Sequence, residues 1–257
     1  MLIARSAFVG GIVLISQSTL ETARAFTVAF TRGINRRNRV VSHHVSSAQV
    51  TFARTGATKC YAERSIPTIE ELSNDDFMKQ VSHSQRILQM LATDPSDQQD
   101  DHVEDLLKAQ LSHSDGIRGF FVTYLTADGD GTPADRSEVP TCLVNAMNEC
   151  SNEHELVSLA CMNVIMPTGM VTMHKDPALS LQSQKTAERG VRVLRSLSHK
   201  AQVREECQAI LAVASGDRKD EVDTSKVAYW EAFFEKWGYE ETQKHDIAKA
   251  VRNVLSP

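Results

Sequence analysis

The sequence contains few aromatic residues, glycines, prolines and cysteines. Aromatic side chains make up 6% of the 257 residues, and there are 12 glycines, 7 prolines and 5 cysteines. These low contents exclude a collagen-like or low-complexity chain and a disulfide-dense scaffold. Long apolar runs are also missing, which excludes a polytopic membrane protein. With 41% apolar and 24% charged residues, the composition is that of an ordinary soluble globular protein.

The first 25 residues have the three parts of a secretory signal peptide. A basic residue, Arg5, precedes an apolar stretch from Ser6 to Ile15, and Ala23-Arg24-Ala25 has the small residues of a cleavage site. The apolar stretch is far shorter than the ~20 residues that span a bilayer. We therefore expect residues 1–25 to be a signal peptide that is removed, and no transmembrane segment.

Acidic residues are missing from Phe26 to Ala62, where Arg, Ser and Thr recur. Such a segment has too little periodic apolar surface to fold and has the composition of an organelle transit peptide. The remainder of the chain, residues 67–257, has 19 basic and 31 acidic side chains and a net charge of −12. We expect residues 26–64 to form a disordered, transit-peptide-like segment and residues 65–257 to form a single domain.

The order of these two segments, with Phe26 directly after the expected cleavage site, resembles the bipartite plastid presequence of algae with secondary plastids of red origin. The resemblance covers residues 1–62 and implies transport to the plastid stroma via the secretory pathway. The composition leaves open a secreted protein with a basic arm or a mitochondrial protein. Nucleic acid is disfavoured as a partner, because a body of net charge −12 repels a polyanion. The body itself resembles no family that its residues allow us to name.

Four cysteines remain after the presequence, namely Cys142, Cys150, Cys161 and Cys207. They form no C-x-x-C pair, so the sequence predicts neither a zinc site nor a thioredoxin-like dithiol. Each lies within an apolar helical pattern, where a buried thiol is the common outcome. We expect buried free thiols.

Apolar residues recur at helical spacing along most of the body, which predicts an all-α, irregular multi-helix domain of about eight helices. Residues 116–126 fit either a helix or a strand, and we favour a helix. The expected segments are helices that follow caps at Thr68 and at residues 73–76, and helices over about 97–111, 138–150, 153–166, 185–197, 203–214, 224–237 and 240–255.

Local signals predict where several of these helices begin and end. Asp115, Asn152 with Glu155, and Thr224 are expected to cap helix starts. Pro167-Thr168-Gly169 is expected to break the helix that begins at Glu153, with residues 170–173 starting another. Gly238 is expected to end a helix in the left-handed conformation, with Tyr239 packing back on its last turn.

The turn-rich segment after residue 127 has two formal matches to ligand-binding motifs. Residues 129–134 fit G-x-G-x-x-A, but no βαβ unit surrounds them. The carboxylates of Asp128, Asp130 and Asp135 would also repel a pyrophosphate. A calcium loop is excluded because Pro133 replaces the required glycine and Val139 the bidentate glutamate. We expect a polar surface turn. The patterns of zinc proteases, di-iron bundles, serine hydrolases and P-loop proteins are missing as well.

Methionines recur at intervals of four, four and three residues at Met162, Met166, Met170 and Met173, beside Cys161 and His174. Soft sulfur ligands suit Cu(I), but methionine at helical spacing more often packs a core or forms a partner-binding face. We expect core packing, leave a partner surface open, and predict no metal and no cofactor.

One helix start gathers side chains that suit binding. His113, Asp115, Arg118 and Tyr124 lie near Gly116 and Gly119. Free backbone N–H groups, an arginine one turn later and glycines that permit close approach would suit an anion or a protein partner. The alternative is structural: Asp115 caps the helix, Gly119 allows close helix packing, and His113 and Arg118 lie in solvent.

These observations favour a non-enzymatic helical protein-binding or assembly factor of the plastid stroma. The hypothesis rests on the missing catalytic patterns and on more aromatic residues than one helix face needs. These residues are candidates for an exposed cluster, with burial in the core as the alternative, and they are Trp230, Phe233, Phe234 and Trp237. One alternative is a small-molecule-binding protein or enzyme whose site joins His113, Arg118 or His174 to a carboxylate from a distant helix. Another is a peripheral membrane protein that uses the basic residues of Lys185–Arg204.

Overall fold

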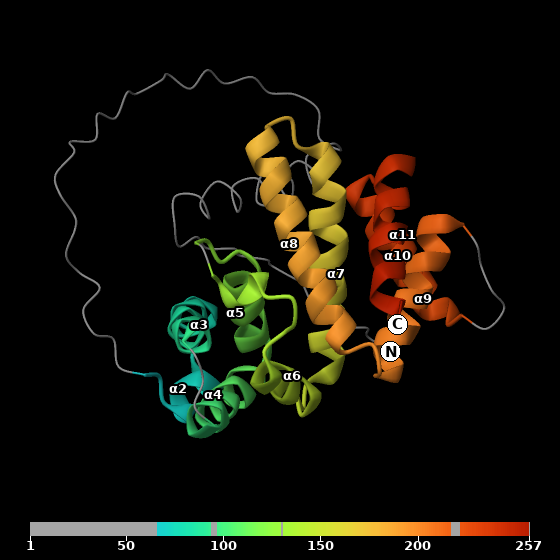
Figure 1. Cartoon of the computed structure of the whole chain (residues 1–257). Coiled ribbons are helices and arrows are strands. Elements are labelled where there is room, and N and C mark those ends of the chain that lie inside the picture. Colours follow the sequence, from blue (N-terminus) through green and yellow to red (C-terminus); the bar gives the residue numbers. More distant parts are fainter. Residues whose placement is uncertain (1–65, 94–96, 130, 217–221, 257) are drawn as a thin grey trace, which may run out of the picture.

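The computed structural model describes residues 66–93, 97–129, 131–216 and 222–256, without the side chains of residues 97–99. The signal peptide and transit-peptide-like segment predicted for residues 1–64 lie outside these ranges. Within them the chain forms ten α-helices, one 3-10 turn and no strand (Figure 1), which confirms the predicted all-α class. The elements are α2 (Ile69–Asn74), α3 (Phe77–Ala92), α4 (Asp97–Gln110), α5 (Ser114–Leu125), η2 (Pro133–Asp135), α6 (Thr141–Asn148), α7 (Glu153–Met173), α8 (Pro177–Ser196), α9 (Ala201–Ser215), α10 (Thr224–Trp237) and α11 (Glu241–Leu255).

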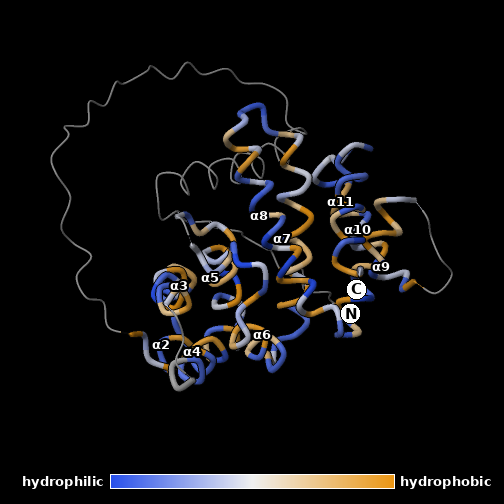
Figure 2. The backbone as a smooth tube through the Cα atoms, viewed as in Figure 1, coloured by the Kyte–Doolittle hydropathy of each residue, from blue (hydrophilic) through white to orange (hydrophobic). Residues whose placement is uncertain are grey.

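An antiparallel hairpin of α7 and α8 forms the centre of the fold (Figure 1). On one side α5 packs against both hairpin helices, and α3, α4 and α6 adjoin α5 or each other. On the other side α11 packs against the hairpin and against α9, which carries α10. Orange and blue segments alternate along α8 and α11 in Figure 2, as expected for helices with one buried face. One continuous apolar core joins both sides.

The most apolar helix, α7, continues through the break predicted at Pro167-Thr168-Gly169, so that prediction was wrong. Proline removes one backbone N–H, whose partner in an uninterrupted helix would be the carbonyl of Asn163. Gly190 of α8 packs so closely on this carbonyl that a Cβ atom at Gly190 would lie 2.7 Å from the oxygen. Packing on both sides of α7 thus outweighs the local stop signal, and residues 170–173 form its last turn.

Length and composition would also allow α7 to cross a membrane. However, 56% of its most apolar window is buried inside the fold, and the core helix of a globular domain passes the same test. Four methionines lie on this helix. Met170 is buried, Met162 and Met166 are half-buried, and Met173 is 43% exposed. Core packing is therefore confirmed for Met170 and holds only in part for the others.

Several predicted helix ends are confirmed. Thr68 and Glu71 form the reciprocal capping box at the start of α2, and Asp76 caps α3. Gly238 ends α10 with a φ of 65°, and the Tyr239 ring packs edge-on against Phe234 with the ring centres 5.3 Å apart. Residues 116–126 are helical as favoured, within α5 up to Leu125.

Other predicted starts shift to a neighbouring residue. His113, not Asp115, is the N-cap of α5, and Asp223, not Thr224, caps α10. Asn152 is the N-cap of α7 as predicted, but it forms no capping box, and its amide donates to Glu155 instead. Two further boundaries were wrong: α8 begins at Pro177 behind an Asp176 cap, well before residue 185, and α6 begins at Thr141.

The four cysteines of the described ranges are free, and Cys142, Cys161 and Cys207 are buried as predicted, while Cys150 is half-buried. The prediction of an exposed aromatic cluster on α10 was wrong. Trp230 and Phe234 are buried, and Phe233 and Trp237 are half-buried. The core absorbs these rings because α10 packs against α9, where Glu206 accepts a 2.8 Å hydrogen bond from the Trp230 indole N–H.

Candidate functional site

The four residues predicted as a site lie along α5, and the structure brings only two of them together. Asp115 and Arg118 form an ion pair of 3.2 Å. His113 instead donates from Nε2 to the Leu72 carbonyl at 2.8 Å, which ties the end of α2 to the start of α5. Tyr124 is 2% exposed, and burial raises its pKa to about 12. It lies nine residues beyond Asp115, about 13 Å along the helix.

The two glycines at this helix start are approached by the protein itself. A Cβ atom at Gly116 would lie 1.7 Å from the Gln110 carbonyl oxygen, and one at Gly119 would lie 2.8 Å from Gln80 Cβ on α3. The close helix packing at Gly119 that the structural alternative predicts is thus confirmed, whereas His113 and Arg118 are half-buried and do not lie in solvent. The start of α5 is an internal junction of helices.

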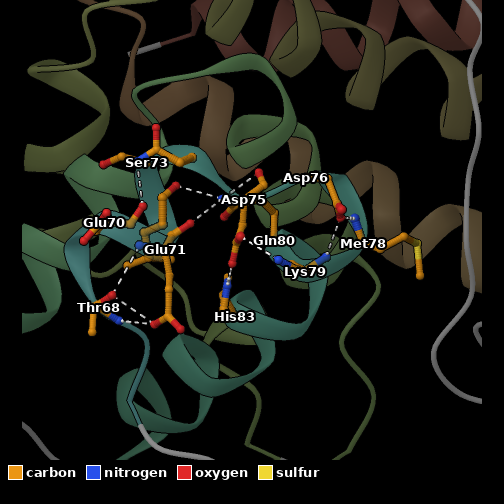
Figure 3. A network of polar contacts seen from close by, with 12 residues as sticks. Thr68, Glu70, Glu71, Ser73, Asp75, Asp76, Met78, Lys79, Gln80 and His83 are labelled. Carbon is orange, nitrogen blue, oxygen red and sulfur yellow. Dashed lines mark hydrogen bonds and ion pairs between the residues drawn. The ribbon is translucent and has the colours of Figure 1, made fainter.

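A buried polar network surrounds this junction. Gln80 Nε2 donates to the Leu72 carbonyl at 2.8 Å, and Gln110 Nε2 donates to Ser84 Oγ at 2.7 Å. Figure 3 shows the adjoining surface contacts, in which Asp75 accepts from His83. Hydrogen bonds from His83 and Lys79 hold the pKa of Asp75 below its ordinary value. These contacts hold α2 and α3 in place.

A buried arginine that sequence reasoning missed fixes the loop between α5 and α6. Arg189 on α8 is 5% exposed and binds both oxygens of Asp135 at 2.7 Å. Its Nη1 donates to the carbonyls of Leu125 and Ala127 at 2.9 and 2.8 Å. Arg192, one turn later, donates to the carbonyl of Ala134 at 2.7 Å. Together they clamp the loop onto α8.

Three other basic residues of the 185–204 stretch also bind oxygens of the chain. Arg195 donates to the Asn253 carbonyl at 3.0 Å, Lys200 pairs with Glu153 at 3.2 Å, and Arg204 donates to two carbonyls of the preceding turn. These internal contacts give Arg195, Lys200 and Arg204 a structural role.

A surface groove of about 490 Å³ lies directly after the clamped loop. The end of α3, the first turns of α4 and α6, and the segment 136–140 form its walls. Leu91, Val103 and Cys142 are buried side chains at its floor. Asp100 and Glu138 lie at its polar rim, where neither forms an ion pair with any described residue.

The wall formed by residues 136–140 leaves backbone groups free. Among the described residues, none forms a hydrogen bond with the backbone N–H or C=O of Ser137, Glu138 or Val139. The sequence of α4 adds five carboxylates against a single lysine. The groove thus combines an apolar floor, available backbone groups and a surplus of negative charge.

Cys142 at the floor does not have the character of a nucleophile. Burial raises the pKa of its thiol, and the carboxylate of Asp100 raises it further. The thiol is therefore protonated at neutral pH and contributes apolar surface. No group of three His, Cys, Asp or Glu side chains within the described ranges could hold a metal ion.

The described chain is thus an all-α multi-helix domain with one clamped loop beside a groove. A family model described as "Uncharacterised conserved protein UCP020893" matches residues 76–254, and the chain belongs to this family. The matched range runs from the cap of α3 into α11 and includes every groove residue. No curated protein matches the chain. No solved structure matches it either.

Proposed function

We propose that this protein is a non-enzymatic, helical protein-binding or assembly factor of the plastid stroma. The groove is the observation that carries the proposal. Its apolar floor within a polar rim is the pattern of a protein-interaction surface. Its cysteine is a protonated thiol, and its backbone groups at residues 137–139 are available to a partner.

The plastid location is supported by the presequence resemblance of residues 1–62. A fluorescent fusion of residues 1–66 tests it in an alga with a secondary plastid of red origin. We expect fluorescence inside the plastid. Retention in the secretory pathway, or fluorescence in mitochondria, would refute the location without affecting the binding proposal.

Affinity purification of the tagged full chain from its own cells tests the binding proposal. We expect a protein partner in stoichiometric amount and a native mass that equals the sum of the two chains. A chain that elutes alone, at the mass of a single copy, would contradict the proposal.

Small-molecule binding is the second candidate, because the volume of the groove falls within the roughly 300–1,000 Å³ of ligand pockets. Native mass spectrometry of the same preparation separates the two candidates. A bound mass of a few hundred daltons on an otherwise single chain would favour the small molecule.

A further inference from the structure

We propose that the groove binds an extended segment of a partner protein that carries an apolar side chain next to a lysine or arginine. The inference deepens the proposed function and rests on it. Three features of the groove define this occupant: the depth of its floor, the free backbone of one wall, and the charge of its rim.

The floor selects an apolar side chain. Leu91, Val103 and Cys142 line the groove, are each at most 5% exposed, and have side chains made only of carbon and sulfur. No charged or amide side chain of the floor could pair with a polar ligand group there. An aliphatic side chain that enters the groove would remove its own apolar surface from water, at about 25 cal/mol per Å².

The wall favours a peptide over a helix or a compact small molecule. Residues 137–139 present backbone donors and acceptors that are unused within the described structure. Pairing with the backbone of an extended peptide satisfies such groups in many recognition modes. The clamp at Asp135 and Arg189 holds the residue that directly precedes this wall.

The rim selects a positive charge. Asp100 and Glu138 have no ion-pair partner among the described residues, and only Arg136 opposes them on this rim. The adjoining helix α4 has a surplus of four carboxylates by its sequence. A lysine or arginine beside the apolar side chain would therefore be attracted, and an acidic residue there would be repelled.

The test uses the isotope-labelled full chain and blocked hexapeptides in millimolar amounts, followed by nuclear magnetic resonance. The probe alternates leucine with lysine, and the two control peptides alternate leucine with glutamate and serine with lysine. We expect only the first to shift the methyl signals of Leu91 and Val103 and the amide signals of residues 137–139. No shift, or equal shifts with the glutamate peptide, would overturn the proposal.

Two pairs of variants locate the binding. Thr141→Trp places a large ring on the exposed first residue of α6 at the groove, and Thr224→Trp makes the same change at the exposed first residue of α10. We expect the first to abolish peptide binding and the second to leave it unchanged. Glu138→Lys should weaken binding roughly fivefold, and the exposed Glu235→Lys should not.

The outcomes distinguish peptide binding in the groove from the broader proposal that the protein binds a protein partner. Peptide binding that survives Thr141→Trp would overturn the groove assignment. If a partner still co-purifies with that variant, protein binding stands and only its location is wrong. Groove signals that move with the concentration of the chain alone would identify a second copy as the occupant, which also overturns the proposal.

Discussion

Removal of the buried guanidinium at Arg189 should destabilise the protein more than any other single arginine substitution on α8. Arg189→Met keeps most of the apolar stem but removes the two bonds to Asp135 and the donors to the Leu125 and Ala127 carbonyls. Loss of one partner of a buried ion pair typically costs 3–5 kcal/mol. Asp135 is 45% exposed and regains water, so we expect the lower end, about 3 kcal/mol.

Thermal and urea denaturation followed by circular dichroism measure this loss. For a domain of this size we expect Tm to fall by roughly 6–12 °C. Arg192→Met is the matched control, because Arg192 is 28% exposed, makes one carbonyl bond and lies 3.8 Å from Asp135, and it should cost about 1 kcal/mol. A loss below 1 kcal/mol for Arg189→Met, or equal losses for both variants, would refute the clamp.

The same pair makes stability depend on acid. Hydrogen bonds from Arg189 lower the pKa of Asp135 below its ordinary 3.8. The stabilisation by Asp135 is therefore complete above about pH 4 and is lost as the pH falls through the lower folded-state pKa. Arg189→Met should remove this part of the acid dependence, which urea titrations at several pH values can measure.

Three further changes have defined expected results. Gly169→Ala should lower the free energy of unfolding by about 2 kcal/mol, because the new Cβ would lie 2.6 Å from the Tyr239 ring. Tyr239→Phe should change it very little, since the buried Tyr239 hydroxyl has no partner among the described residues. Urea denaturation measures both, and a larger loss for Tyr239→Phe would contradict the packing. Trp230→Phe removes the indole donor to the buried Glu206 and should lower the free energy of unfolding by about 2 kcal/mol in the same assay. An unchanged free energy of unfolding would mean that this hydrogen bond adds no stability. Burial lowers the pKa of His174, so the free energy of unfolding should fall as the pH drops from about 6.5 towards that lower pKa. His174→Asn should reduce this pH dependence. An unchanged pH profile in the variant would refute the role of His174.

Local sequence signals predicted the fold class and several helix ends. The capping pair at Thr68 and Glu71 and the left-handed end at Gly238 depend on residues a few positions apart. Their physical causes lie within the short segment that shows the pattern. Helix periodicity likewise reports only which face is apolar, and that was sufficient for the all-α class.

Features that depend on distant residues were not predictable in the same way. Asp135 and Arg189 are 54 residues apart, so a buried ion pair looked like separate surface charges. The continuity of α7 through Pro167 depends on its neighbours in space, including Gly190 of α8. The burial of Trp230 likewise depends on α9, which single-helix periodicity does not report.

The groove was missed for the same reason. Its floor comes from α3, α4 and α6, and its free wall comes from a segment without regular structure. No sequence motif marks such a convergence. The site predicted from sequence on α5 instead drew on neighbouring residues, and the structure distributes these between an ion pair, a helix junction and the core.

The central claim is that the groove holds a protein partner. The most direct measurement is the amount of partner that co-purifies, per mole of tagged full-length chain, for the wild type, Thr141→Trp and Thr224→Trp expressed in the protein's own cells. We predict a stoichiometric partner with the wild type and Thr224→Trp, and loss of that partner with Thr141→Trp. Equal recovery with all three chains would contradict the claim.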